Sequence, residues 1–137
     1  MKTTLILLLS VFIFSSCEKE SGETPKLQDG TYSGRFILKN TDPAVNRADI
    51  VVATSVTING DNYSSTAGPN RTPAGGSGKF IVKYPVINFA ESHAWTTDFD
   101  HNLILSGEYT SEISGDSLFL SKKAGSNIYS YRLGKAK

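Results

Sequence analysis

From Thr31 onward, apolar residues recur at every second position, and Gly, Asn, Asp and Ser interrupt this pattern at short intervals. A period of two places successive side chains on opposite faces of an extended strand, whereas a helix needs apolar residues three or four positions apart. Helical spacing is scarce beyond residue 30. The sequence therefore predicts an antiparallel all-β domain.

The alternation predicts eight strands joined by short turns. Asn59-Gly60 is the strongest turn signal, because both residues tolerate a positive φ. Eight antiparallel strands are enough for a sheet to close on itself and lose its edges. We therefore expect an eight-stranded antiparallel up-and-down barrel. The predicted strands cover residues 31–39, 48–58, 62–67, 78–84, 86–90, 102–113, 117–123 and 128–134.

A four-residue pattern of Ser, Gly, a charged residue and an aromatic residue occurs three times, at 33–36, 77–80 and 106–109. In each copy the charge would face outward and the ring inward. A strand can coil sharply at glycine, and a neighbouring ring can cover the gap that the missing side chain leaves. The pattern favours barrel closure. Chance recurrence in a chain rich in serine and glycine is the alternative.

The first 17 residues are typical of an export signal that ends at a modified cysteine. Lys2 precedes an apolar run at 5–14, which as a helix would span only about 15 Å, half of a bilayer core. Ser15-Ser16-Cys17 then resembles a bacterial lipobox, with Phe14 where Leu is usual. We expect removal of residues 1–16 and acylation of Cys17. The alternative is an ordinary secretory signal cut near Ser16.

An acylated Cys17 would tie the mature protein to a membrane. Two or more acyl chains, such as palmitate, make such attachment stable. The acid-rich Glu18-Lys19-Glu20 resembles the surface-export signal of Bacteroidota lipoproteins, and no Asp follows the cysteine. We expect an outer-membrane protein on the periplasmic or cell-surface face. Residues 17–28 would form a flexible tether, and 29–137 the barrel domain.

Charge and cysteine content exclude several classes of function. Removal of residues 1–16 takes away one charged residue, Lys2, so that 13 Lys and Arg remain against 13 Asp and Glu. This balance provides no basic field for nucleic acid. Cys17 is the only cysteine, so the domain has neither a disulfide nor a thiol nucleophile. The chain has no Gly-x-Ser-x-Gly motif, and we expect no enzyme. We expect a binding protein that is a monomer.

Residues 91–101 hold both histidines of the chain and several carboxylates. They lack His-x-x-x-His spacing and a third His or Cys. The start of a calcium loop at 98–102 fails because Leu103 stands where Gly is required. We therefore expect no metal, no cofactor and no catalytic residue here. The residues concerned are Glu91, His93, Asp98, Asp100 and His101.

Three short motifs resemble those of lipocalins. Gly30-Thr31-Tyr32 is similar to their Gly-x-Trp motif, and Thr97-Asp98-Phe99 to their Thr-Asp-Tyr motif. Arg132, near the end of the last strand, matches the arginine that packs across the conserved aromatic residue. The chain resembles the small lipocalin-like (calycin-type) barrels among lipoproteins of Bacteroidota. The resemblance implies, loosely, a small apolar or amphipathic ligand.

Two hypotheses follow for the function. In the first, a lipid-anchored envelope module binds a small apolar ligand inside the barrel, which needs a hollow of roughly 300 Å³ or more, open at one end. In the second, aromatic rings fill the barrel, and the loops at 68–77 and 91–101 make it a protein-interaction or inhibitory domain. The candidate ligand contacts are Tyr32, Phe36, Phe80, Trp95 and Tyr109.

Overall fold

The computed structural model describes residue 22 and residues 24–137. The predicted signal peptide and Cys17 lie outside the described residues. Within the part of the chain that is described, no helix has the length and apolar character needed to cross a bilayer.

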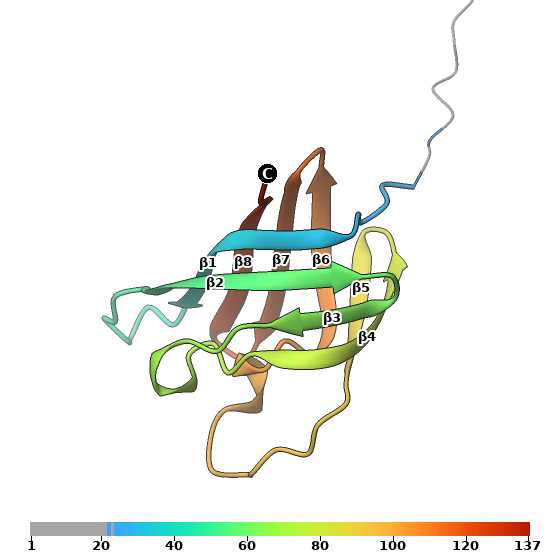
Figure 1. Cartoon of the computed structure of the whole chain (residues 1–137). Helices are drawn as coiled ribbons and strands as arrows, with labels where there is room; N and C mark the ends of the chain where they lie inside the picture. The colour runs from blue at the N-terminus through green and yellow to red at the C-terminus, as the bar shows by residue number, and fades with distance from the viewer. Residues whose placement is uncertain (1–21, 23) are drawn as a thin grey trace, which may run out of the picture.

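The chain forms a closed antiparallel β-barrel in which each strand pairs with the next along the sequence (Figure 1). β1 and β8 also pair with each other, over nine residue positions, and this contact closes the sheet. The predicted eight-stranded up-and-down barrel is thus confirmed. The strands are β1 (Gly30–Asn40), β2 (Ile50–Asn59), β3 (Asn62–Ser65), β4 (Gly76–Lys83), β5 (Val86–Glu91), β6 (Gly107–Ser114), β7 (Ser117–Ala124) and β8 (Asn127–Lys135).

The sixth strand begins later than the alternation predicts, at Gly107 and not at Asn102. The preceding residues form a short 3-10 turn, η2 (His101–Leu103). The side chain of Asp100 accepts a hydrogen bond from the backbone N–H of Asn102 and so caps this turn. Capping competes with strand pairing, which is why the apolar Leu103 does not belong to β6.

β2 also begins later than predicted, at Ile50 and not at Ala48, and β3 ends at Ser65 and not at Ala67. Further differences lie around β4. Its first residues, Gly76 and Ser77, were predicted as loop but pair with Ser65 and Ser64 of β3. The loop thus covers 66–75 and contains a second 3-10 turn, η1 (Pro69–Arg71). Tyr84 was predicted as the last residue of the strand 78–84, yet β4 ends at Lys83, and Tyr84 belongs to the turn into β5 and is 42% exposed.

Stacked aromatic rings occupy the barrel interior. Tyr63 packs edge-on against Phe89 at 4.8 Å between ring centroids, and Phe89 packs against Tyr109 at 5.8 Å. Tyr109 also packs against Tyr131, with the ring centroids 6.0 Å apart, and Tyr131 packs against Phe36, with the centroids 5.1 Å apart. These rings are at most 3% exposed and run from β3 to β1 across the lumen. Edge-to-face pairs of this kind add to the stability that burial provides.

The two ends of the barrel differ in what covers them (Figure 1). At the tether end, Leu27 is buried in the core, and Tyr32 donates its hydroxyl hydrogen to the carbonyl of Gln28. Lys135 Nζ also lies 3.0 Å from Gln28 Oε1. Packing therefore begins at Leu27, two residues before the predicted domain start at 29. The opposite loop end carries the segments 41–49, 66–75, 92–106 and 125–126.

Two glycines of the repeated pattern lie where strands nearly touch. A Cβ at Gly34 would be 2.0 Å from the carbonyl oxygen of Arg132, on the seam between β1 and β8. A Cβ at Gly78 would be 2.0 Å from the carbonyl oxygen of Ala90. Gly107, in the third copy, has open space around it. Two of the three copies thus make the close strand contacts expected of barrel closure.

Candidate functional site at the loop end

Four of the five residues predicted to contact a ligand lie together in the structure, and the fifth lies elsewhere. Tyr32, Phe36, Phe80 and Tyr109 are buried in the core, between 0% and 8% exposed. Trp95 lies apart from them, in the loop after β5. Four of the candidates therefore meet inside the barrel, as the alternation predicted, but they meet as packed side chains.

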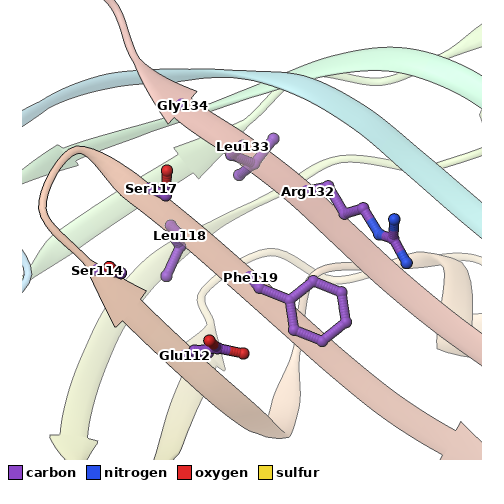
Figure 2. A pocket seen from close by; sticks show the side chains of 8 residues that line it. All are labelled: Glu112, Ser114, Ser117, Leu118, Phe119, Arg132, Leu133 and Gly134. Carbon is purple, nitrogen blue, oxygen red and sulfur yellow. The ribbon is translucent and has the colours of Figure 1, made fainter.

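Three hollows in the described part of the chain open on the outer surface. The first, of about 550 Å³, lies on the outer face of β6, β7 and β8, where Arg132 and Phe119 project side by side from neighbouring strands (Figure 2). The second, of about 390 Å³, lies at the loop end beside Trp95. The third, of about 320 Å³, lies between β4, β5 and β6 and includes the exposed Ile81.

The lipocalin motif implies that Arg132 packs across Tyr32, but in the structure it does not. Its guanidinium lies over the ring of Phe119, 5.6 Å from the centroid, on the outer face of the barrel. Tyr32 points inward from β1 and reaches the carbonyl of Gln28. The strand register explains the difference. Arg132 pairs with Arg35 and points to the same face of the sheet, whereas Tyr32, three positions before Arg35, points to the opposite face.

The two loops highlighted by the sequence are joined at the loop end. Arg71, in the loop after β3, lies 3.5 Å from a carboxylate oxygen of Asp98 and 3.4 Å from the hydroxyl of Thr96. The same guanidinium lies 5.1 Å from the ring centroid of Phe99. Each of these exposed contacts is weak alone, but together they hold one loop against the other.

Backbone hydrogen bonds reinforce this junction. The N–H of Ala74 donates to the carbonyl of Leu103, and the N–H of Leu105 donates to the carbonyl of Gly75, both at 2.8 Å. Gly75 and Ile104 thereby form a short parallel bridge. Because backbone pairing fixes the relative position of both segments, residues 66–75 and 92–106 form one continuous surface.

Asp100 closes the barrel mouth beneath that surface. Its carboxylate accepts hydrogen bonds from the Tyr129 hydroxyl and from the backbone and side-chain amides of Asn102. Lys122 lies nearby, inside the mouth, and donates to the carbonyl of Ser106 at 3.1 Å. Burial raises the pKa of Asp100, but these hydrogen bonds and the Lys122 charge together bring it below its ordinary value.

We expect the domain to lose stability in acid partly through Asp100. A carboxyl whose folded-state pKa is depressed stabilises the fold above its unfolded pKa, near 3.8, and this contribution disappears as the pH falls through the folded value. Asp100 is exposed enough for solvent screening to limit the effect to below about 1 kcal/mol. Urea unfolding at pH 7 and pH 3 should show a smaller acid loss for Asp100→Asn than for the parent. Equal losses would contradict this role.

Glu91 organises the other side of the loop end. Its side chain is only 9% exposed, and it accepts hydrogen bonds from the backbone N–H groups of Ser77 and His93 at 2.9 and 2.8 Å. His93 Nδ1 lies 3.0 Å from the same carboxylate. Burial, followed by the Glu91 charge, raises the pKa of the neighbouring Tyr63. Glu91 therefore fixes the start of the loop after β5 to β4.

The contacts of His93 do not form a nucleophilic relay. Ser77 Oγ lies 3.1 Å from His93 Nδ1, so that a serine, a histidine and a carboxylate come together. A relay uses one ring nitrogen for the serine and the other for the carboxylate. Here Ser77 and Glu91 both contact Nδ1, so the ring cannot pass a proton between them. This arrangement holds the start of the loop after β5 against β4.

The residues considered for a metal have separate partners. Glu91 bonds to His93, Asp98 to Arg71 and Thr96, and Asp100 to Tyr129. His101 Nε2 donates to the carbonyl of Thr96 at 2.7 Å. Among the described residues, no three His, Cys, Asp or Glu side chains are grouped so that they could hold a metal ion.

The hollow beside Trp95, which we call the loop-end hollow, is lined by small polar residues and one indole. Its volume is about 390 Å³. Trp95 is held from one side by Phe99, with the ring centroids 5.7 Å apart. Buried atoms of two lining residues, Trp95 Nε1 and Ser65 Oγ, have no hydrogen-bond partner. The lining consists of Ser64, Ser65, Gly76, Ser77, His93, Ala94 and Trp95.

Sequence reasoning identified part of this site. The irregular polar-aromatic segment at 91–101 pointed to Trp95 and His93. No pattern pointed to Ser64 or Ser65 of β3, and Ser77 was predicted only as part of the repeated pattern at 77–80 and of the loop at 68–77. Ser64 and Ser77 are adjacent because the strands pair in one particular register, and isolated serines give no periodic signal.

No protein-family model matches this chain, and no curated protein or solved structure shows significant similarity to it.

Proposed function

We propose that this chain is a lipid-anchored binding module of the cell envelope that recognises its ligand on the loop end. One observation carries the proposal: an open hollow adjoins two loops that are locked together, while stacked rings occupy the interior. A binding surface that is already ordered loses little entropy when a ligand arrives. The packed interior argues against the first sequence hypothesis, in which the ligand lies inside the barrel.

The position of the tether supports this orientation. The chain enters the barrel at the tether end, where Gln28 contacts Tyr32 and Lys135. Gln28 is eleven positions after Cys17, a distance of at most about 40 Å when the chain is fully extended. A lipid on Cys17 would therefore attach the barrel to the membrane through its tether end, and the loop end is the end farther from the attachment point.

A protein partner on the side of the barrel is the second candidate. Ile81 is 62% exposed and Tyr84 42% exposed, and both belong to the β4–β5 hairpin. Ile81 also lines a hollow of about 320 Å³ that Lys83 and Glu108 border. Exposed apolar side chains with charged neighbours are typical of protein-interaction surfaces. This patch favours a protein partner, at a different place from the loops 68–77 and 91–101 that the second sequence hypothesis named.

The anchor has a direct test. Replacement of Cys17 by Ala removes the thiol that would carry the lipid, so the protein is expected to leave the membrane fraction and lack acyl chains. Membrane fractionation and intact mass spectrometry would measure both. A conservative control is Ser16→Ala, which keeps the thiol and should remain acylated. A Cys17→Ala protein that still carries lipid would contradict the anchor.

Footprinting tests the binding surface. Hydroxyl-radical oxidation of the anchored protein in isolated envelopes, compared with the purified protein, should show protection of Trp95 and Phe99 but not of Tyr84. Protection of Tyr84 alone would favour the protein partner on the β4–β5 hairpin. If neither region is protected in envelopes, the binding-module proposal is wrong.

A further inference from the structure

We infer that the loop-end hollow binds a neutral sugar residue. The inference rests on the proposed function, because it names the ligand class of the same site. It follows from the size and lining of the hollow, from the indole of Trp95 in its wall, and from two buried polar atoms of lining residues that have no hydrogen-bond partner.

The lining offers hydrogen bonds without charge. Ser64 and Ser77 contribute hydroxyls, and His93 contributes an exposed imidazole. The nearest carboxylate, Glu91, does not line the hollow; it is 9% exposed and is bonded to Ser77 and His93. A charged ligand would find no counter-charge in this wall, whereas hydroxyl groups can both donate to serine and accept from it.

The indole of Trp95 supplies the complementary apolar surface. A sugar ring has a face of C–H groups bordered by hydroxyls, so it fits a site that combines one aromatic ring with a few polar groups. Phe99 packs against Trp95 at 5.7 Å, and Arg71 lies over Phe99 at 5.1 Å. The indole is therefore supported from behind before any ligand binds. The hollow, at about 390 Å³, has the volume of a small-ligand site.

Unsatisfied polar atoms are concentrated in this wall. Three buried side-chain atoms in the described part of the chain lack hydrogen-bond partners, and two of them, Trp95 Nε1 and Ser65 Oγ, belong to residues of this hollow. The third, the Tyr131 hydroxyl, lies in the barrel interior. Buried polar groups without partners are unusual in folded proteins. Both atoms are buried, so they mark an unusual wall and do not yet face the open hollow.

Trp95 makes the inference directly measurable, since it is the only tryptophan in the chain. The acylated mature protein, in a detergent without a sugar headgroup, would be titrated with galactose, N-acetylglucosamine, maltose and cellobiose while Trp95 emission is recorded. We expect a saturable change with at least one of these sugars at millimolar or lower concentration, and at least fivefold weaker binding of glucuronate. If none of the four changes the emission up to about 50 mM, the inference is wrong.

Two serine variants locate the site. Ser64→Ala removes one lining hydroxyl that faces the solvent side of β3, and loss of one neutral hydrogen bond corresponds to about fivefold weaker binding. The matched control is Ser117→Ala, because Ser117 lines the separate hollow on β6–β8 and should leave the affinity unchanged (Figure 2). If Ser117→Ala weakens binding and Ser64→Ala does not, the sugar binds elsewhere and the inference is wrong.

The footprint separates this inference from the proposed function. Protection of Trp95 and Phe99 in envelopes, together with an absence of sugar binding, would leave the binding module in place and reject the sugar. Sugar binding that Ser64→Ala weakens, together with protection of Trp95, would support both. Absence of protection and of sugar binding would reject both.

Discussion

Replacement of Gly34 by Ala is expected to lower the free energy of unfolding by about 3 kcal/mol, a large part of the stability of a typical domain. The added Cβ would lie 2.0 Å from the carbonyl oxygen of Arg132 and 3.0 Å from the Cα of Leu133. Both are backbone atoms of β8, so no side-chain rotation can relieve the contact. The strands that close the barrel would have to separate at that point.

The matched control is Gly134→Ala, in the strand paired with Gly34. A Cβ at Gly134 has no atom within 4 Å, so this change should leave stability unchanged or raise it by less than about 1 kcal/mol. Urea unfolding followed by far-ultraviolet circular dichroism would measure both variants. Similar midpoints for Gly34→Ala and Gly134→Ala would show that the seam between β1 and β8 is not tightly packed.

Replacement of Tyr109 by Ala is expected to cost about 3–5 kcal/mol. The Tyr109 ring is fully buried and touches Phe89 and Tyr131, while the ammonium of Lys122 lies 4.9 Å from its centroid. Removal of the ring would interrupt the series of stacked aromatic side chains at its centre and leave a cavity. Urea unfolding would measure the loss, and a cost below about 1 kcal/mol would contradict a filled interior.

Tyr131→Phe is the contrasting change on the same series of rings. It keeps the ring and removes a buried hydroxyl that has no hydrogen-bond partner. An unpartnered hydroxyl is costly to bury, so this variant should be as stable as the parent or more stable. A marked loss of stability would mean that the hydroxyl has a partner, such as a buried water molecule.

The faces of the strands could be predicted from local sequence. Phe36, Ile58, Leu120 and Tyr131 each lie at an alternate position of an apolar run, and each is at most 1% exposed. Alternation is reliable here because one face of every strand meets the same interior. The prediction was wrong where a side chain diverted the backbone, as Asp100 does when it caps η2 and delays the start of β6.

The candidate site was predicted less completely than the fold. The segment at 91–101 was recognised as unusual, and Trp95 and His93 both line the hollow. The contact of Arg71 with Asp98 joins residues 27 positions apart, and the pairing of Ser64 with Ser77 joins two strands across a loop. Neither contact leaves a trace in local periodicity, because it depends on how the loops fold back over the barrel.

The sequence alone determined that this chain forms an all-β barrel of eight strands, because strand faces and tight turns depend on residues that are close together in the chain. Tertiary structure decided what the barrel contains and where the open hollow beside Trp95 lies. Whether the inward rings enclose a cavity or fill it depends on their summed volumes and mutual angles. Whether loops are ordered depends on long-range contacts, and here Arg71, Gly75 and Leu105 bring two of them together beside an open hollow.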